Sequence, residues 1–413
     1  MPLLPSTTDD SLFDNLLPGD IYRYSRACKD AYSAVSSYIR RRFRIQSVLG
    51  KYFTDNEILE FRELQYHTGM LVSGSTALQF FERVMYPDSD LDLYVEHRYR
   101  REVAAWLLST GYTYVERPIW PLTVEDNEPN ETLEEILDRV PSTEEDDESQ
   151  TDFLEPEVPR GYFGAAILMN FEKKNPVRKI QVITCHFAPL QMILNFHSTC
   201  VMNILTYDKA YALFPHATFD EHKSLVNLPS NARWRRRYVR RSAAIGRYKE
   251  RGWEPVYNIT RQEYEDPKSM FAHGVRRVGD AKCWTIPLFP KLDLPEGTIQ
   301  TSSWSLYYDK RLEPRISFGV FYWKRLKFSH LFADELLSRH IADVAGEIED
   351  RLRDAQQTNE ETDIEFRRKV NLYLDLFYSE GNGSTFDPWT RREAEDIDRE
   401  LEERAQTYLR ISS

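Results

Sequence analysis

The spacing of apolar and polar residues changes period several times between residues 70 and 115. Residues 70–73 form a short apolar run that predicts a strand, and Gly74-Ser75 after it predicts a turn. Apolar residues then recur at every third or fourth position over 77–84, which predicts an amphipathic helix. Over 91–95 they alternate with polar residues, as in a strand with one apolar face. With a helix over 98–108 and a last strand before 115, the stretch predicts strand, helix, strand, helix, strand.

The rest of the chain gives a coarser pattern of expected elements. We expect short helices over 14–45 and 57–64, strands over 164–171 and 179–185, a helical run over 189–205, strands within 280–325, and helices in the last 80 residues. The expected fold class is therefore α/β (α+β), with a mixed-sheet core carrying helices, then an α+β region and a helical C-terminal tail. The expected divisions are a helical segment 1–50, a core 51–215, a region of basic helix and antiparallel strands 216–330, and C-terminal helices 331–413.

Charge is concentrated in one segment. The chain of 413 residues and 48.8 kDa has a formal net charge of −12, but the window 125–157 alone carries about −14. The remainder is therefore near neutral, so the net charge does not exclude contact with nucleic acid. The stretch 118–160 is acidic, contains proline and has few aromatic residues, which predicts a disordered insertion.

The sequence has no apolar run of the roughly 20 residues that a membrane-spanning helix needs. Its first residues lack the pattern of a signal peptide, and its four cysteines are too widely spaced for a disulfide framework or a CxxC zinc site. We therefore expect no membrane association and an intracellular protein, cytoplasmic or nuclear.

Candidate chemistry lies in the 70–95 block. Gly74 and Ser75 stand where a strand turns into a helix, and the N–H groups of a helix N-terminus attract phosphate. Asp90 and Asp92 are two residues apart on the next strand, so both carboxylates leave the same face. Together they could hold Mg²⁺, which prefers oxygen ligands. Asp88 could help them or simply shape the preceding turn.

At these residues the sequence resembles the DNA polymerase β-type nucleotidyltransferase superfamily, in its minimal form. The matching motifs are Gly-Ser-Thr-Ala-Leu at 74–78 and Ser-Asp-Leu-Asp-Leu at 89–93, and the resemblance covers about 66–215. Several longer stretches also resemble a large group of fungal proteins with nucleotidyltransferase-like cores and often an F-box-like N-terminus. The resemblance implies a nucleoside triphosphate (NTP) bound at Gly74 and Ser75, with Mg²⁺ held by Asp90 and Asp92.

The family usually has a third carboxylate on a later strand, which binds metal and deprotonates the acceptor. Here the corresponding strand is Lys-Ile-Gln-Val-Ile at 179–183, whose central residue is Gln181. Glutamine offers a carbonyl oxygen but neither negative charge nor a base. Glu172, in the neighbouring hairpin, could take over the role, although its spacing does not require it.

Two further segments suggest partners. Leu-Pro-Gly-Asp-Ile at 17–21, followed by an arginine-rich helix, resembles the opening of an F-box, which implies a Skp-type ubiquitin-ligase adaptor bound through residues 1–45. The alternative is that these helices cap the core. The stretch 233–251 has nine Lys or Arg with interleaved aromatic residues, which suits either nucleic-acid contact or an ordinary solvated helix. His197, on the apolar stripe predicted for the helical run, is expected to be a packed core residue.

The sequence thus leaves two classes of function open. In the first, the protein transfers a nucleotidyl group from NTP to an acceptor, with Asp90, Asp92 and Gln181 at the reacting centre. In the second, it is a binding protein, either a non-catalytic nucleotide-binding pseudoenzyme or an F-box-type adaptor.

Overall fold

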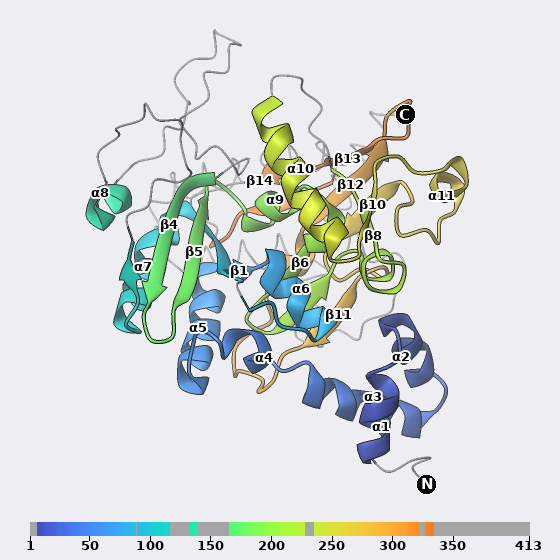
Figure 1. The fold of residues 1–413 in the computed structure, drawn as a ribbon, viewed down its shortest axis with the longest axis horizontal. Coiled ribbons are helices and arrows are strands. Elements are labelled where there is room, and N and C mark those ends of the chain that lie inside the picture. The colour runs from blue at the N-terminus through green and yellow to red at the C-terminus, as the bar shows by residue number, and fades with distance from the viewer. Residues whose placement is uncertain are drawn as a thin grey trace, which may run out of the picture.

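The computed structural model of the chain describes residues 6–87, 89–115, 132–138, 165–227, 235–321 and 327–333. These residues form a mixed α and β fold with one large sheet and several smaller ones, as expected for the α+β class (Figure 1). The predicted C-terminal helices fall outside the described residues apart from 331–333, where the chain forms the end of a strand, His330–Phe332, and not a helix. Among the described helices none has the length and apolarity to cross a membrane.

An eight-stranded sheet forms the centre of the molecule, with strand order β11-β7-β6-β1-β2-β5-β4-β3. Its strands are β1 Leu71–Val72, β2 Leu91–Glu96, β3 Thr113–Tyr114, β4 Ala165–Lys173, β5 Arg178–Cys185, β6 Asn203–Leu205, β7 Lys209–Ala212 and β11 Trp284–Pro287. All neighbouring strands pair antiparallel except β2 and β5, which are parallel.

The helices pack around this sheet, and α1, α2 and α3 lie together at one corner (Figure 1, lower right). The helices are α1 Ser6–Phe13, α2 Pro18–Ser25, α3 Lys29–Arg42, α4 Gln46–Leu49, α5 Asp55–Thr68, α6 Gly74–Glu82, α7 Arg100–Ser109, α8 Leu133–Asp138, α9 Pro189–Leu194, α10 Arg235–Glu250 and α11 Arg261–Glu265. Smaller sheets are formed by β10 Gly274–Arg277, β12 Ser303–Tyr308 and β13 Pro314–Ser317, by β14 Gly319–Phe321 and β15 His330–Phe332, and by β8 Lys223–Leu225 and β9 Glu254–Val256.

The alternation predicted over 91–95 places the two faces of β2 in different environments. Leu91, Leu93 and Val95 are fully buried in a core shared with α5, α6 and α7. Tyr94 points to the other face, into a second core shared with α9, β12 and β15. Because side chains alternate along a strand, Asp92 lies on the same face as Tyr94.

The predicted order of strand, helix, strand, helix, strand over 70–115 is confirmed by β1, α6, β2, α7 and β3. The expected strands over 164–171, 179–185 and within 280–325 are also present, as β4, β5, β11, β12, β13 and β14. The basic stretch 233–251 contains the helix α10.

The helical run expected over 189–205 is wrong beyond Leu194. The chain leaves α9 at Asn195, makes a short 3₁₀ turn over Thr199–Val201, and enters β6. β6 pairs with both β1 and β7, so these long-range hydrogen bonds override the local helical periodicity. His197 therefore does not lie on a helical stripe.

The expected disordered insertion over 118–160 lies outside the described residues except for 132–138, which contain α8. Its Ile136 and Leu137 are buried in the first core, and the Leu137 carbonyl accepts a hydrogen bond from Arg100 Nε at 2.9 Å. The expected domain boundaries stay predictions. The main sheet nevertheless takes its edge strand β11 from the 216–330 region.

Candidate functional site

The turn between β1 and α6 is built around Gly74. This residue has φ +66°, in the left-handed region that favours glycine, and a Cβ placed on it would lie 3.0 Å from Asp92 Oδ2. Ser73 fixes the turn from the other side, because its hydroxyl donates to the Asn203 carbonyl of β6 at 2.6 Å. Gly74 is thus required both by the backbone conformation and by the closeness of Asp92.

Helix α6 begins at this turn, so its first N–H groups have no partner within the helix. Gly74 is buried and Ser75 is partly exposed. The predicted phosphate-binding pair therefore stands at a real helix N-terminus and directly beside Asp92, as the spacing suggested.

Asp90 and Asp92 stand at the start of β2, and both are partly buried. The loop that precedes the two aspartates is held in place by hydrogen bonds from residues 51 and 52, which follow α4. Lys51 Nζ donates to the carbonyls of Pro87 and Ser89, both at 2.7 Å, and the Tyr52 hydroxyl donates to the Ser89 carbonyl at 2.7 Å. Thr76 of α6 donates to the Asp90 carbonyl at 3.2 Å. The two aspartates therefore sit on a fixed backbone, held by residues that the sequence pattern did not single out.

The electrostatics of this pair are unusual. Burial, with the charge of Asp90 as the second cause, raises the pKa of Asp92 to about 7. The pKa of Tyr52 is raised to about 12 by burial, while its hydrogen bond to Ser89 opposes the shift and the charges of Asp92 and Asp90 add to it. A cation bound at Asp90 and Asp92 would favour the ionised form of Asp92 and lower its pKa.

The strand register places Gln181 directly beside Asp92. In the parallel pairing of β2 with β5 the partner of Asp92 is Gln181, and in the antiparallel pairing of β5 with β4 the partner of Gln181 is Asn170. Gln181 Nε2 donates to Asn170 Oδ1 at 3.2 Å. The row of paired residues across β2, β5 and β4 therefore consists of one carboxylate, that of Asp92, and two amides, those of Gln181 and Asn170. The sequence did not predict the place of Asn170 in this row.

Glu172 is placed elsewhere. It pairs with Lys179 and with Thr113, one pleat away from the row of Asp92 and Gln181. It is also two strands away from β2, about 10 Å at ordinary strand spacing. Asp88 lies outside the described residues.

The oxygen donors present suit a hard divalent cation but make a small ligand set. Asp90 and Asp92 supply two carboxylates, and the Gln181 amide supplies a neutral oxygen nearby. Within the described ranges there is no group of three or more His, Cys, Asp or Glu side chains arranged to hold a metal ion. Mg²⁺ usually keeps several waters and is bound by one or two carboxylates with substrate phosphates, so the pair fits Mg²⁺ best together with a nucleotide.

The basic helix α10 lies close to this site. Burial raises the pKa of the Tyr248 phenol in this helix, and the negative charge of Asp92 raises it further. Arg251, just after the helix, stacks over the Tyr86 ring with 4.2 Å from its guanidinium carbon to the ring centroid. Sequence composition predicted the basic helix, but no local signal placed it near Asp92.

His197 lies under α10 and is partly buried rather than fully buried in the core. Burial lowers its pKa to about 4, and the nearby charges of Arg241 and Arg247 lower it further. Its Nδ1 is 2.7 Å from the Ser198 hydroxyl and its ring is 5.5 Å from that of Tyr248. It is therefore a neutral histidine in a positively charged environment.

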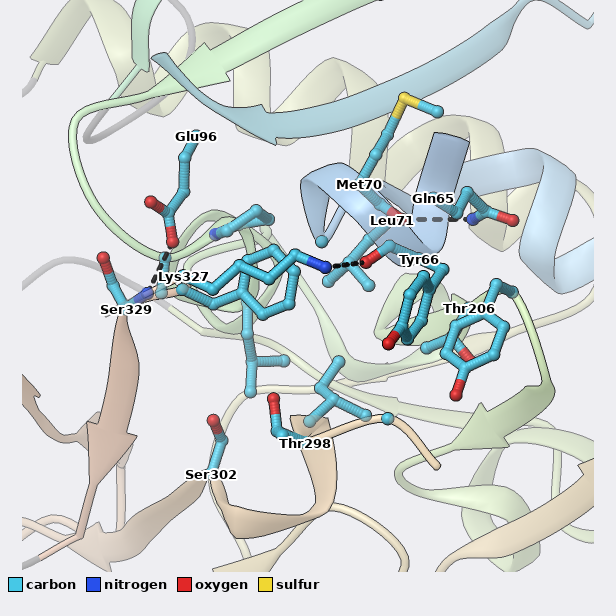
Figure 2. Close-up of a pocket in the computed structure, with 18 of the residues that line it drawn as sticks. Gln65, Tyr66, Met70, Leu71, Glu96, Thr206, Thr298, Ser302, Lys327 and Ser329 are labelled. Atoms are coloured by element: carbon cyan, nitrogen blue, oxygen red, sulfur yellow. Dashed lines mark hydrogen bonds between the residues drawn. The ribbon is translucent and has the colours of Figure 1, made fainter. Parts of the chain in front are cut away.

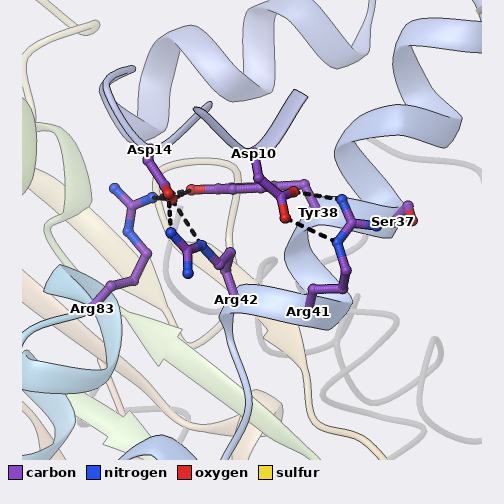
Figure 3. A network of polar contacts seen from close by, with 7 residues as sticks. All are labelled: Asp10, Asp14, Ser37, Tyr38, Arg41, Arg42 and Arg83. Atoms are coloured by element: carbon purple, nitrogen blue, oxygen red, sulfur yellow. Dashed lines mark hydrogen bonds and ion pairs between the residues drawn. The ribbon is translucent and has the colours of Figure 1, made fainter. Parts of the chain in front are cut away.

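The N-terminal helices are joined to the core by buried side chains and by a charged network (Figure 3). The Asp14 carboxylate accepts hydrogen bonds from the Tyr38 hydroxyl at 2.9 Å and from the Arg42 guanidinium. It also forms an ion pair with Arg83, at the end of α6. Asp10 pairs with Arg41 at 2.5 Å. The N-terminal helices are thus attached to the end of α6 through contacts of Asp14 and Tyr38 with Arg83.

No family model, curated protein or solved structure matches this chain. The interpretation of the site therefore depends on its own geometry.

Proposed function

We propose that this protein binds a nucleoside triphosphate together with Mg²⁺, at the N-terminus of α6 and at Asp90 and Asp92, and that it transfers the nucleotidyl group poorly or not at all. The observation that carries the proposal is the register that pairs Asp92 with Gln181. It supports the proposal because the strand beside Asp92 carries an amide, where the family resemblance implies a third carboxylate.

Three features support nucleotide binding. Gly74 brings the first N–H groups of α6 beside Asp92, which suits phosphate. Asp90 and Asp92 leave the same strand face, and burial together with the charge of Asp90 raises the pKa of Asp92. Asp90 and Asp92 would hold Mg²⁺, which would favour their ionised form and supply the positive charge that polarises a phosphoryl group.

The case against efficient transfer is that the residues paired with Asp92 across the sheet are amides and offer no base in addition to the aspartates. An acceptor hydroxyl must lose its proton, and neither Gln181 nor its hydrogen-bonded neighbour Asn170 can accept one. Glu172 is a pleat and two strands away. Among the described residues the site therefore offers groups that suit nucleotide and metal, but the strands beside Asp92 supply no third carboxylate in its row.

The test measures binding and transfer on the same preparations. We expect the wild-type protein to bind a fluorescent ATP analogue only when Mg²⁺ is present, and the Asp90→Asn/Asp92→Asn variant to lose at least tenfold in affinity. With α-labelled NTPs and RNA, protein or small-molecule acceptors, we expect little labelled product. Gln181→Asp restores a carboxylate beside Asp92 and should raise transfer at least tenfold, whereas the control Gln181→Asn should not.

Failure would take one of two forms. If the wild-type protein shows no Mg²⁺-dependent nucleotide binding, the proposal is wrong. If it transfers label efficiently and Asp90→Asn/Asp92→Asn abolishes the transfer, the chain is a nucleotidyltransferase and Gln181 is compatible with catalysis.

A second candidate function, an F-box-type adaptor, is favoured by apolar side chains exposed on the N-terminal helices. Tyr22 is 60% exposed and Tyr32 is 64% exposed, and neither is needed for the core. A Tyr22→Ser/Tyr32→Ser variant should keep the stability of the wild type but lose co-purification with a Skp-type adaptor. Deletion of residues 1–45 is a poorer test, because Tyr38 and Ile21 belong to the main core.

A further inference from the structure

A groove of about 730 Å³ lies between the outer edge of the main sheet and the N-terminal helices. One wall is formed by β11 and the residues after it, and the opposite wall by α2 and α3, which lie together at that corner of the molecule (Figure 1). Residues 268–270 and 280–283 complete the lining. The groove is larger than the cavity of about 330 Å³ beside β1 (Figure 2).

The cavity beside β1 has charged groups in its wall, but they are already engaged. Lys327 Nζ donates to the Tyr66 carbonyl at 3.0 Å, and the Glu96 carboxylate accepts the Ser329 N–H at 2.5 Å (Figure 2). These contacts indicate no particular class of ligand. The groove at β11 differs, because both its backbone groups and its charged side chains point to one kind of occupant.

The wall formed by β11 is a free edge of the sheet, since β7 is its partner in the strand order. The Leu288 N–H donates to the Asp208 carbonyl at 2.8 Å, so these two residues are a hydrogen-bonded pair of the antiparallel ladder. Such pairs alternate along the strand, so the backbone groups of Ile286 also point to β7. Those of Thr285 and Pro287 therefore point to the open side, where both residues line the groove.

Three cationic side chains in the groove form no ion pair with a carboxylate among the described residues. Arg40 lies over the Phe289 ring, with 5.2 Å from its guanidinium carbon to the ring centroid. Lys268 is exposed, and the partly buried Lys282 donates from Nζ to the Ser269 carbonyl at 2.8 Å. These three charges are therefore available to an anionic ligand.

The two acidic side chains in the lining are paired. Asp280 forms an ion pair with Arg276 at 2.6 Å. Asp220 accepts the Gly19 N–H at 3.5 Å, and its carboxylate lies 3.9 Å from His216 Nε2. The groove therefore presents an excess of positive charge, which favours an anionic ligand by charge complementarity.

We propose that this groove binds an acidic peptide of another protein, in extended conformation, as an additional strand beside β11. The Thr285 N–H and the Thr285 and Pro287 carbonyls pair with the peptide backbone, and the three free cations contact its carboxylates. Apolar side chains of α2 and α3, among them Ile21 and Ile39, cover the apolar residues of the peptide. A small anion would satisfy the cations but not the backbone groups of β11, which favours a peptide.

The acidic window of this chain, 125–157, is a less suitable occupant. The chain leaves β3 before this window and enters β4 after it, and these two strands lie at the opposite edge of the sheet. Seven strand spacings, or about 34 Å, separate β3 from β11. The groove is also independent of the proposed nucleotide site, because β7, β6 and β1 lie between β11 and β2.

The charge of the groove is tested with the full chain and a fluorescein-labelled heptapeptide, Glu-Val-Glu-Val-Glu-Val-Glu. Fluorescence anisotropy should show saturable binding that weakens at least fivefold between about 50 and 300 mM NaCl. Arg40→Glu/Lys268→Glu should weaken it at least tenfold. The control Lys174→Glu/Lys310→Glu changes the net charge equally at exposed lysines outside the groove, and should change affinity less than twofold.

The backbone pairing is tested separately. Thr285→Pro removes the outward N–H without removing a hydrogen bond to β7, and should weaken binding at least fivefold, whereas Thr285→Val keeps the N–H and should bind as the wild type does. The same peptide with N-methylated amides cannot donate to the carbonyls of β11 and should bind at least tenfold more weakly. This peptide tests the pairing even if Thr285→Pro lowers the midpoint of thermal unfolding.

Several results would overturn the proposal. It is wrong if the peptide shows no saturable binding, or if Arg40→Glu/Lys268→Glu binds as well as the wild type. It is also wrong if the N-methylated peptide or a single-stranded thymidine heptamer binds as tightly, because the groove would then recognise charge alone. Asp90→Asn/Asp92→Asn should leave peptide binding unchanged, which separates this site from the nucleotide site. Tyr22 and Tyr32 also line the groove, so they stay unchanged here and the adaptor hypothesis is tested independently.

Discussion

The carboxylate of Asp92 should make the folded protein less stable as the pH rises, and replacing it should reverse this. Burial raises its pKa from the ordinary 3.8 to about 7, so the folded protein holds the neutral acid more readily than the unfolded chain does. The contribution of this group to stability is therefore present near pH 4, is lost as the pH rises toward 7, and is level above that. Asp92→Asn keeps the shape and removes the charge, so it should be more stable than the wild type at pH 8.

The size of the effect follows from the shift. About three pKa units correspond to a ceiling of about 4 kcal/mol at pH 8. Because Asp92 keeps partial contact with solvent, screening reduces this, and we expect about 2 kcal/mol at pH 8 and less than about 1 kcal/mol at pH 5. Mg²⁺ with ATP should stabilise the wild type at pH 8 more than the variant, because the variant keeps only one of the two carboxylates, that of Asp90.

The assay is urea unfolding at pH 5 and pH 8, with and without Mg²⁺ and ATP. Asp293→Asn, at an exposed aspartate, is the control and should show no pH-dependent change. The reasoning is refuted if Asp92→Asn is no more stable than the wild type at pH 8 without Mg²⁺, or if its advantage is the same at both pH values.

Two further substitutions test how the site is held. Gly74→Ala should lower the free energy of unfolding by about 1–2 kcal/mol, because Gly74 has φ +66°, and should weaken Mg²⁺-dependent nucleotide binding at least fivefold. The control Gly246→Ala, with open space around it in α10, should leave stability unchanged or raise it. Equal effects of the two variants in urea unfolding would contradict the role given to Gly74. Tyr52→Phe removes the hydrogen bond to the Ser89 carbonyl and should lower the free energy of unfolding by about 1 kcal/mol. It should also weaken Mg²⁺ binding, measured by titration, about threefold. If its Mg²⁺ affinity equals that of the control Tyr307→Phe, at an exposed tyrosine, the aspartate loop does not depend on this bond.

The parts of the fold that could be predicted from sequence are those fixed by local pattern. The alternation of apolar and polar residues over 91–95 predicted the strand and the strand face on which Asp92 lies. The glycine at position 74 predicted the turn at the start of α6. Gln181 was also correctly predicted to lie on a strand, because the apolar residues around it are typical of one.

What could not be predicted depends on contacts between distant residues. Nothing local to 203–205 indicates a strand, since β6 is stabilised by pairing with β1 and β7. Lys51 and Tyr52 anchor the aspartate loop across more than 35 positions, and Asn170 meets Gln181 through a hairpin. The residues that line the cavity beside β1 come from six separate stretches of the chain, so no single stretch of sequence contains its signal.

The position of β1 at the centre of the main sheet has a consequence for how the chain is made. β1 lies between β2 and β6, and Val72 pairs with Leu205, about 130 residues later. The hydrogen-bond partners of the buried Arg62 are synthesised later still, since its guanidinium donates to the carbonyls of Tyr207 and Pro290. At about 5–20 residues per second on the ribosome, roughly 7–27 s pass between the synthesis of β1 and that of its partner β6. For that interval the apolar surface of α5 and α6 stays uncovered on the nascent chain, which makes it a natural site for chaperone binding during translation.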